Sequence, residues 1–438
     1  MPKARTRSRR RFLQAASATA AGSLFSPGPV WGLNPKSAHA NERVRVAMIG
    51  CGLRGNQLSD NLPDDCQIVA TVDAYLPRAR RLAAKLPGEV ESVADYRTIF
   101  DRDDLDGVMI ASTGQHHVLP AMLACQAGRD VYVEKPLSNY FAEGRALVSA
   151  ARRYERVVQV GTQQRTMEMD RFACELVRDG GIGELHAVEC VNYGSAQPYP
   201  AEGLPEEPVP EGMDWDVWLG CAPHRPYNKR LCDWVSQKSS GWQGWRDYHV
   251  GGIGGMGAHS LDMVQYALGM DDSGPVELWP KGVDAAGIRR VDFRYANGVE
   301  VRSSYPSKRP FRGPRLGAIF VGSKCKIEIN RNRFVTNPVD FVKDGPPAEL
   351  AEKWEGPGWI ARDHVADWLD AIKTRRRPNA DVEIGHRTAT VYHLISITRL
   401  LNRRLKWDPI AERFPEDDEA NALLEMPRRK GWELPEVV

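Results

Sequence analysis

Three glycines that follow an apolar run are the first residues in this chain whose spacing points to chemistry. Gly50, Gly52 and Gly55 form a Gly-x-Gly-x-x-Gly pattern directly after residues 44–49, a β-rich run typical of a buried strand. In such a pattern the first glycine permits a tight turn and the second lets the backbone approach a pyrophosphate. The third allows the following helix to pack closely on the strand, with the phosphates on free N–H groups at its start. The pattern predicts a dinucleotide site, and an ordinary glycine-rich turn is the alternative.

An acid at the end of the next apolar run strengthens that prediction. Asp73 follows residues 67–72. A carboxylate there accepts hydrogen bonds from ribose hydroxyls and repels a 2′-phosphate, which favours NAD over NADP, although NADP stays open. We assign four further positions to the same cofactor site: Leu53 and Arg54 within the turn, and Thr113 and His117 after a third apolar run.

Two residues have the chemistry to handle the proton of a substrate hydroxyl. Lys135, in the triplet Glu134-Lys135-Pro136, follows another strand-like run. Ligands of open α/β sheets bind at that end of a strand, so we place Glu134 and Lys135 at the cofactor, with Lys135 polarising the hydroxyl. His259 has an ordinary pKa near 6.5 and is a candidate base, and Asp262 shares its helical face and could orient the ring. A solvated lysine and a helix-capping histidine are the alternatives.

An aromatic-rich stretch between residues 213 and 248 predicts a carbohydrate pocket, because aromatic faces stack on sugar rings and arginine binds hydroxyls or carboxylates. Its members are Trp215, Trp218, Trp234, Trp242 and Trp245, with Arg225, Tyr227 and Arg246 between them. Core packing is the alternative for any single tryptophan. The predicted substrate-binding residues are Gln163, Arg165, Trp245, Arg246, Tyr248 and Asp262.

The elements that must position these residues fall into two sets. Strands are expected at 44–49, 67–72, 107–111, 131–133 and 157–160, and helices at 77–85, 96–100, 118–127 and 141–154. This alternation predicts an α/β fold with a parallel sheet, an N-terminal Rossmann dinucleotide-binding domain over residues 41–162.

Residues 163–438 have a different pattern, with several strands and few helices between them. Helices are expected at 259–268, 362–374 and 387–401, and strands at 287–295, 299–305, 317–321 and 324–330. The pattern predicts a C-terminal α+β domain with a large, mostly antiparallel open sheet, which binds substrate and supports oligomerisation.

Residues 1–40 have the composition of a twin-arginine export signal. Arg9 and Arg10 lie in a basic start without acids, residues 15–25 are small and apolar, and Ala38-His39-Ala40 fits a cleavage site. A disordered basic tail is the alternative. We expect a periplasmic or otherwise exported protein, carried in folded form by the twin-arginine machinery and without a membrane anchor.

Charge and cysteine content exclude other classes of function. The seven positive charges of residues 1–40, subtracted from a formal net charge of +2, leave −5, which argues against nucleic acid as a partner. The eight cysteines form no C-x-x-C pair, so we predict neither a metal site nor a disulfide framework. One bridge formed after export stays open.

These motifs together resemble the Gfo/Idh/MocA oxidoreductase family, which includes glucose–fructose oxidoreductase and inositol dehydrogenase. The matching segments are Gly50–Gly55, Asp73, Glu134-Lys135-Pro136, residues 251–262, residues 381–387 and residues 407–409. The resemblance implies that Lys135 and His259 act with an acid four residues before the histidine. That position is Gly255, which has no side chain to titrate. Asp247 or Tyr248 could replace the acid, and the sequence selects neither.

Three functions fit these residues. The first is an exported oxidoreductase that moves a hydride between a tightly bound nicotinamide cofactor and a sugar or polyol hydroxyl. The second is redox-neutral cleavage of a glycoside through a transient keto-sugar. The third is a sugar-binding protein with a vestigial nucleotide site, which the intact Lys135 and His259 disfavour. The resemblance, and a sheet face left open by its helices, also predict a homodimer or homotetramer.

Overall fold

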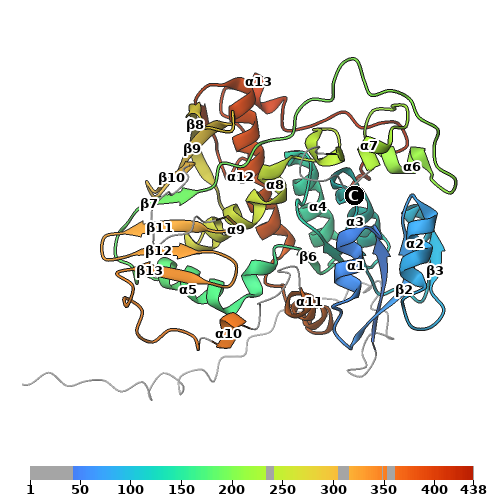
Figure 1. Ribbon diagram of the computed structural model, residues 1–438, viewed down its shortest axis with the longest axis horizontal. Helices are drawn as coiled ribbons and strands as arrows, with labels where there is room; N and C mark the ends of the chain where they lie inside the picture. The colour runs from blue at the N-terminus through green and yellow to red at the C-terminus, as the bar shows by residue number, and fades with distance from the viewer. Residues whose placement is uncertain (1–42, 233–240, 304–314, 348, 353–360, 438) are drawn as a thin grey trace, which may run out of the picture. The chain divides into compact units, whose positions relative to one another are not determined.

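The computed structural model describes residues 43–232, 241–303, 315–347, 349–352 and 361–437 (Figure 1). The export signal predicted for residues 1–40 and Trp234 lie outside the described residues. Within these ranges no helix combines the length and apolar character that crossing a membrane requires.

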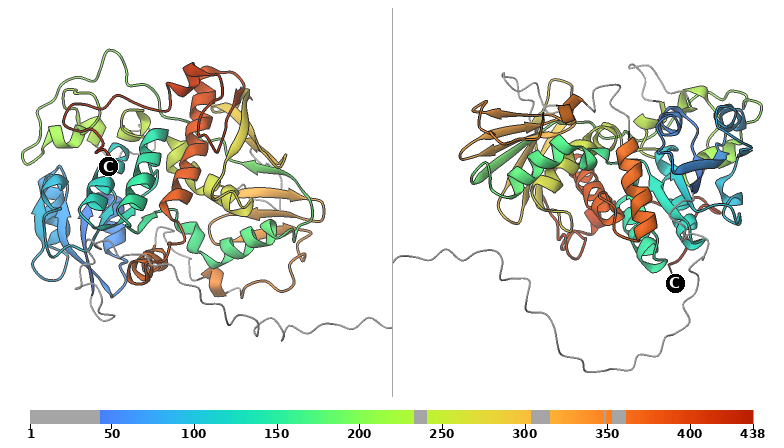
Figure 2. Two further views of the ribbon diagram at one scale, coloured as in Figure 1. Left: turned by 180° about the vertical axis from the view of Figure 1, so that it is seen from behind. Right: turned by 90° about the horizontal axis from the view of Figure 1, so that it is seen from below.

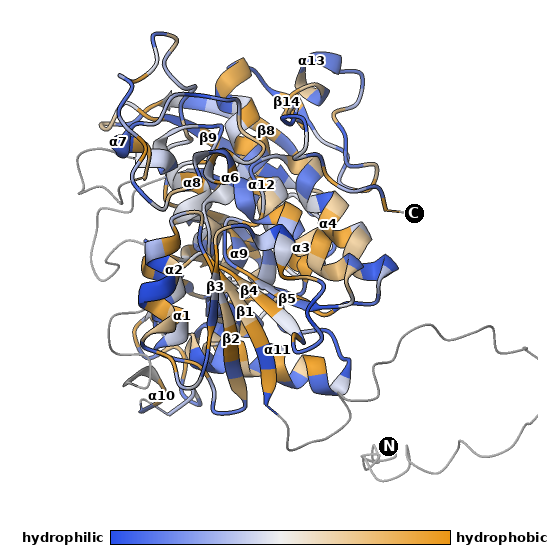
Figure 3. Cartoon of the chain, turned by 90° about the vertical axis from the view of Figure 1, so that its right-hand side faces the viewer, coloured by the Kyte–Doolittle hydropathy of each residue, from blue (hydrophilic) through white to orange (hydrophobic). Residues whose placement is uncertain are grey.

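The first half of the chain forms the predicted parallel sheet, with strand order β3-β2-β1-β4-β5-β6. Its strands are β1 (Val44–Ile49), β2 (Cys66–Val72), β3 (Glu91–Val93), β4 (Gly107–Ile110), β5 (Asp130–Val133) and β6 (Val158–Val160). Its helices are α1 (Leu53–Ser59), α2 (Leu76–Ala83), α3 (Val118–Gln126) and α4 (Phe141–Arg153). Figure 3 shows apolar residues concentrated in the central strands, as expected for strands covered on both faces. The Rossmann prediction is confirmed.

The second half forms an eight-stranded sheet of order β13-β12-β11-β7-β10-β9-β8-β14. Its strands are β7 (Leu185–Cys190), β8 (Pro275–Val283), β9 (Arg289–Tyr295), β10 (Glu300–Ser303), β11 (Ala318–Gly322), β12 (Lys326–Ile329), β13 (Phe334–Asn337) and β14 (Leu405–Lys406). All neighbours are antiparallel except β7 and β10. The prediction of a mostly antiparallel sheet is therefore confirmed.

Three helices separate this sheet from the Rossmann half (Figure 2): α5 (Glu168–Arg178), α9 (Gly257–Ala267) and α12 (Val382–Leu401). The other helices are α6 (Trp215–Leu219), α7 (Lys229–Cys232), α8 (Gly252–Gly255), α10 (Glu349–Glu352), α11 (Arg362–Thr374) and α13 (Asp418–Asn421). Short 3-10 turns occur at Tyr96–Thr98, Gly114–His116, Gln163–Thr166 and Gly241–Gly244, so the helix expected at 96–100 is a single tight turn.

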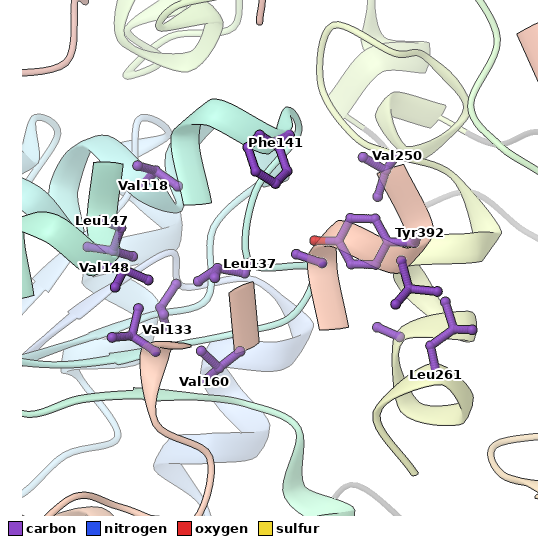
Figure 4. Close-up of a cluster of buried hydrophobic side chains, with 14 of the residues drawn as sticks. Val118, Val133, Leu137, Phe141, Leu147, Val148, Val160, Val250, Leu261 and Tyr392 are labelled. Carbon is purple, nitrogen blue, oxygen red and sulfur yellow. The ribbon is translucent and has the colours of Figure 1, made fainter. Parts of the chain in front are cut away.

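The two halves share a hydrophobic core across the expected boundary at residue 162. Figure 4 shows Val133, Leu147 and Val160 of the Rossmann half in one cluster with Leu261 and Tyr392 of the second half. On the other face of the parallel sheet, α11 buries Trp368 completely, and its ring lies 3.3 Å from the position that a Cβ on Gly107 would take. Side chains of both halves therefore pack in one core. Because such cores are closely packed, the boundary between the halves is well ordered on both sides.

The uncovered face of the second sheet carries charge. Val301 and Phe293 pair across β10 and β9 toward the core, so the alternating residues Glu300, Arg302 and Arg294 lie on the opposite face. Arg302 Nε donates to Glu300 at 2.8 Å. In these strands the open face is therefore not the apolar surface on which we based the oligomer prediction. A homodimer or homotetramer stays a prediction from the resemblance, which light scattering would test.

Three buried histidines predict that the protein loses stability in acid. Burial lowers the pKa of His116 to about 4 and the pKa values of His249 and His393 to about 3, whereas an unfolded histidine titrates near 6.5. Between those values only the unfolded state takes up protons, so stability is full above pH 6.5 and declines as the pH falls. We expect a loss of roughly 1.4 kcal/mol per pH unit for each histidine.

Thermal unfolding measured from pH 8 to pH 4.5 tests this prediction. His393→Asn should flatten the decline, whereas the same change at the exposed His186 should leave it unaltered. A melting temperature that is constant down to pH 5 would contradict it.

Candidate active site

One cavity of about 780 Å³ lies at the carboxyl ends of the Rossmann strands and is lined from both halves of the chain. The first half contributes the glycine turn, Asp73, Thr113, His117 and the Glu134-Lys135-Pro136 triplet. The second half contributes His249, Gly255, His259 and Arg331. The predicted cofactor residues and the predicted catalytic pair therefore meet in one space.

The glycine turn has the geometry that its pattern predicts. Gly50 has φ 91°, and a Cβ on it would lie 2.5 Å from Ser112 N. A Cβ on Gly55 would lie 2.1 Å from Gly50 O, whereas a Cβ on Gly52 would meet nothing within 4 Å. Gly52 lines the cavity and begins α1 without a side-chain cap, and the first turn of α1 holds no acid. This open, uncapped turn fits the pyrophosphate of a dinucleotide.

A matched pair of substitutions separates the two roles of these glycines. Gly55→Ala forces the helix away from the turn and should lower the free energy of unfolding by about 1–3 kcal/mol, as overpacking usually does. Gly52→Ala fills only cavity space, so stability without cofactor should be unchanged while nucleotide affinity falls. Denaturant unfolding and NAD titration of both variants are the measurements. Equal stability losses in the two variants would contradict the assignment.

Asp73 lies where the ribose of the adenosine should bind. Its carboxylate accepts hydrogen bonds from Cys51 N at 3.0 Å and Tyr75 N at 2.9 Å, which hold it at the cavity wall. Arg78 also lines the cavity and approaches Asp73 at 3.4 Å. We did not anticipate Arg78 from the sequence. Since an arginine beside the ribose can accept a 2′-phosphate, Arg78 is the residue that would permit NADP.

The segment 212–220, called here the strap, comes from the second half and lies over the Asp73 end of the cavity. Met213 pairs with Tyr75 in an antiparallel bridge, and Asp214 N donates to Ala74 O at 2.8 Å. Trp218 lines the cavity, and its carbonyl lies 2.9 Å from His116 Nε2. The C-terminal segment secures the strap, because Arg429 Nε donates to Gly220 O at 2.9 Å. The strap thus encloses the end of the cavity that Asp73 marks as the adenosine site.

Glu134 links the glycine turn to the junction between the halves. Arg54 Nε donates to Glu134 Oε1 at 2.7 Å, and Arg54 Nη2 donates to Gln163 Oε1 at 3.0 Å. Burial raises the pKa of Glu134, but Arg54 and Lys135 outweigh it and hold that pKa below its ordinary value. Gly161 leaves the room this carboxylate needs, since a Cβ there would lie 2.8 Å from it. Glu134 is therefore a fixed anion beside Lys135.

Lys135 reaches across the cavity toward the second half. Its Nζ donates to Gly255 O at 3.0 Å. Burial lowers the pKa of Lys135 from its ordinary value, while the Glu134 carboxylate raises it. The ammonium therefore faces the cavity with one acceptor on the protein, and it retains donors for a ligand oxygen. His117, which we assigned to the cofactor, supports this triplet, with Nδ1 at 2.6 Å from Pro136 O.

His259 faces the same space from α9. Its side chain is buried, and its Nδ1 has no hydrogen-bond partner among the described residues. Burial and the nearby charges of Lys135, Arg331 and Arg54 lower the pKa of His259 well below 6.5. The ring is therefore neutral at physiological pH and can accept a proton. This corrects our expectation of a titration near neutrality, because sequence alone does not reveal the neighbouring cations.

His249 occupies the space beside Gly255, where the resemblance places an acid. A Cβ on Gly255 would lie 3.4 Å from His249 Cε1. His249 Nδ1 accepts from Gly251 N at 3.0 Å, and burial first and Lys135 second lower its pKa to about 3. His249 is thus a neutral wall of the cavity. Neither Asp247, whose carboxylate pairs with Arg225 at 2.5 Å, nor the fully buried Tyr248 lines the cavity.

Two predicted substrate residues bind each other. Arg165 Nε donates to Asp262 Oδ1 at 2.8 Å, and Arg165 Nη2 donates to Asp271 at 2.7 Å. Arg165 and Asp262 are both buried and lie outside the cavity lining. Asp262 also accepts from Thr388 Oγ1 at 2.9 Å, so these contacts favour the structural role, which the sequence left as open as a role in orienting His259. This ion pair instead joins the helices behind the site.

The structure divides the predicted aromatic pocket. Trp218 and Trp242 line the cavity, whereas Trp245, Arg246 and Tyr248 do not. Trp245 packs edge-on against Tyr199 with ring centroids 5.5 Å apart. Trp218 lies in the strap near the adenosine end, and Trp242 packs edge-on against His249 near Lys135. Of the predicted tryptophans that are described, Trp242 is therefore the better candidate for a substrate contact.

Fold and cavity define a class of protein, a two-domain oxidoreductase built on a Rossmann fold. The model described as an oxidoreductase family, NAD-binding Rossmann fold, matches residues 44–162. The model described as an oxidoreductase family, C-terminal alpha/beta domain, matches residues 198–341 and 358–434. The chain belongs to the Gfo/Idh/MocA oxidoreductase family, and its cofactor is NAD.

The curated relatives of this chain are named for different activities. A glycosyl hydrolase family 109 protein of Stenotrophomonas maltophilia is 28% identical over 231 residues, 47% of each chain. Inositol 2-dehydrogenase 3 of Saccharopolyspora erythraea is 32% identical over 160 residues, 35% of this chain and 46% of the relative. The matches span about half the length of these curated relatives. The crystal structure of aldose-aldose oxidoreductase from Caulobacter crescentus, complexed with glycerol, covers 83% of this chain and 100% of its own with TM-score 0.55 at 17% identity, a likeness of fold alone.

Proposed function

We propose that this protein transfers a hydride between a tightly held nicotinamide cofactor and a CH–OH group of a sugar or polyol. The observation that carries the proposal is the meeting of Lys135 and His259, from opposite halves, in the cavity that contains the glycine turn. Inositol dehydrogenases among the relatives support a polyhydroxylated substrate.

The two residues divide the proton chemistry between them. NAD supplies the hydride acceptor when it is bound. His259, neutral and with an unpartnered Nδ1, accepts the hydroxyl proton as the C–H bond breaks. The Lys135 ammonium donates a hydrogen bond to the same oxygen and stabilises the negative charge that develops on it. Burial lowers the pKa of Lys135, and the Glu134 carboxylate acts in the opposite direction and so favours the ammonium form.

The strap supports the idea that the cofactor stays bound through many turnovers. It contacts the backbone directly after Asp73, at Ala74, Tyr75 and Leu76, and is itself held by Arg429. Release of the adenosine end would require these contacts to open. Retention suits an exported enzyme, because free nicotinamide nucleotide is scarce outside the cytoplasm.

Redox-neutral cleavage of a glycoside is the second candidate. Gly255 removes the acid that the usual dehydrogenase arrangement contains, and one relative is named a glycosyl hydrolase family 109 protein. In that reaction a sugar hydroxyl is oxidised transiently, elimination or hydrolysis follows, and the hydride returns to the sugar. Lys135 and His259 would serve both reactions, so only the products separate them.

The test is to denature purified protein, assay the supernatant for NAD(H) and NADP(H), and then treat intact protein with sugars, polyols and glycosides. Lasting reduction of the bound nucleotide together with a keto product supports the oxidoreductase. Bond cleavage without lasting reduction supports the second candidate. Protein that contains no nucleotide and binds none when it is added would refute both.

We also propose export in folded form, on the sequence of residues 1–40. Because the export receptor reads paired arginines, Arg9→Lys combined with Arg10→Lys should hold the protein inside the cell. Cell fractionation followed by immunoblotting measures this, with Arg5→Lys combined with Arg7→Lys as the control. Normal export of the Arg9/Arg10 variant would rule out the twin-arginine route.

A further inference from the structure

Arg331 is a cation in the cavity wall that forms an ion pair with no acid among the described residues. It lies on the turn between β12 and β13, in the left-handed backbone region with φ 46°, and it lines the cavity. Among the described residues it has neither an ion pair nor a side-chain hydrogen bond, and its Nε is buried without a partner. The other two cavity arginines are paired, Arg54 with Glu134 and Arg78 with Asp73.

Arg331 lies at the reacting end of the cavity. Its charge lowers the pKa values of both Lys135 and His259. Burial lowers the pKa of Arg331 itself, with Arg54 acting in the same direction, and Asp170 only partly offsets them. Around Lys135 the cavity thus carries three cations, Arg54, Lys135 and Arg331, against one anion, Glu134.

Such an excess of positive charge favours an anionic ligand. A guanidinium that is partly buried without a counterion is costly, and a ligand carboxylate that accepts both arms of its fork removes that cost. Gly255 acts in the same direction, because an acid at that position would repel an anionic group bound near Lys135. The absence of an acid at Gly255 and the presence of Arg331 without an ion pair among the described residues are both explained by one negatively charged substrate.

Resting on the proposed function, we propose that the substrate is a sugar acid, a uronic or aldonic acid whose carboxylate binds Arg331 while its hydroxyl lies between Lys135 and His259. The cofactor pyrophosphate is the competing anion for Arg331. The glycine turn and the uncapped start of α1 already provide for it, whereas Arg331 comes from the sheet of the second half.

Titration calorimetry on the nucleotide-loaded protein tests the proposal without requiring turnover. The probes are glucuronate, galacturonate and gluconate, each against its neutral counterpart, with glucose 6-phosphate and a glucose sulfate as other anions. Wild type should bind at least one acid about 10- to 100-fold more tightly than its neutral counterpart, the range expected for a charged, bidentate contact.

Arg331→Gln should abolish that preference, and Arg331→Lys, which keeps the charge without the fork, should retain part of it. Arg333→Gln is the matched control, because Arg333 is an exposed arginine on the same turn and outside the cavity lining. It should keep the full preference. Gly255→Asp should weaken acid binding by repulsion.

The proposal is overturned if wild type shows no preference for acids, or prefers the phosphate or sulfate ester, or if Arg331→Gln keeps the preference. It is also overturned if Arg331→Gln weakens NAD binding alone, since Arg331 would then be a phosphate contact. Failure of the proposed function gives a different result. If only the proposed function fails, acids bind through Arg331 but no probe reduces the nucleotide. If only this inference fails, the protein oxidises neutral polyols and shows no preference for acids.

Discussion

Lys135→Met is expected to lower the turnover number about 10²-fold or more while the protein keeps its nucleotide. Methionine preserves the volume of the side chain but removes the charged donor, whose hydrogen bond is strongest when the substrate oxygen carries negative charge. Cofactor retention should survive, because the glycine turn and the strap hold the other end of the nucleotide. Steady-state kinetics and the nucleotide content of the purified variant are the measurements.

The control is Lys373→Met, the same change on α11, where the lysine pairs with Asp65 at the surface. It should leave turnover unaltered. If Lys135→Met retains nearly full turnover on the true substrate, the proposed mechanism is wrong, even though the fold and the cofactor stand.

His259→Ala should cause a comparable loss of turnover and also change the pH profile. Because the pKa of His259 lies well below 6.5, the neutral base is fully present at neutral pH. Wild-type kcat/KM should be level near neutral pH and fall in acid, as the ring takes up a proton. The variant should lack the part of this acid decline that His259 causes.

The profile must be measured where the enzyme stays folded, since the buried histidines also destabilise the protein in acid. A circular dichroism control at each pH separates the two effects. An acid decline of the same size and midpoint in His259→Ala would show that another group carries the proton.

The sequence predicted the Rossmann half well, because its strands are buried on both faces and appear as continuous apolar runs. Each predicted strand there lies within about a residue of the observed one. In the second half β7, a central strand, was missed because Leu185–Cys190 mixes polar and apolar residues. The helix α5 was missed as well, although its apolar residues recur at helical spacing.

Site residues were predictable where a motif fixes the backbone. They were not predictable where tertiary contacts determine which residues line the cavity. Gly50, Asp73, Lys135 and His259 belong to motifs and were brought together as expected. Arg331 lies on a hairpin turn in no motif, so nothing in the sequence places it beside Lys135.

Arg165 and Asp262 were predicted to bind substrate, but they bind each other outside the cavity lining. A polar residue near a domain junction can serve a ligand or a buried ion pair, and the choice depends on Asp271 and Thr388. The tryptophans were similarly ambiguous. A tryptophan can lie in the core, in the strap or in a ligand pocket, and the local sequence does not distinguish these environments.

Transfer of deuterium from substrate to cofactor tests the central claim most directly. The nucleotide-loaded protein is mixed with sugars, polyols and sugar acids deuterated on the carbinol carbons, and the nucleotide is then extracted for mass spectrometry. The account predicts one deuterium on the nicotinamide with wild type and almost none with Lys135→Met. Wild type should also reduce its nucleotide more slowly with the deuterated substrate than with the unlabelled one. Absence of label from every substrate, in protein shown to contain NAD, would contradict it.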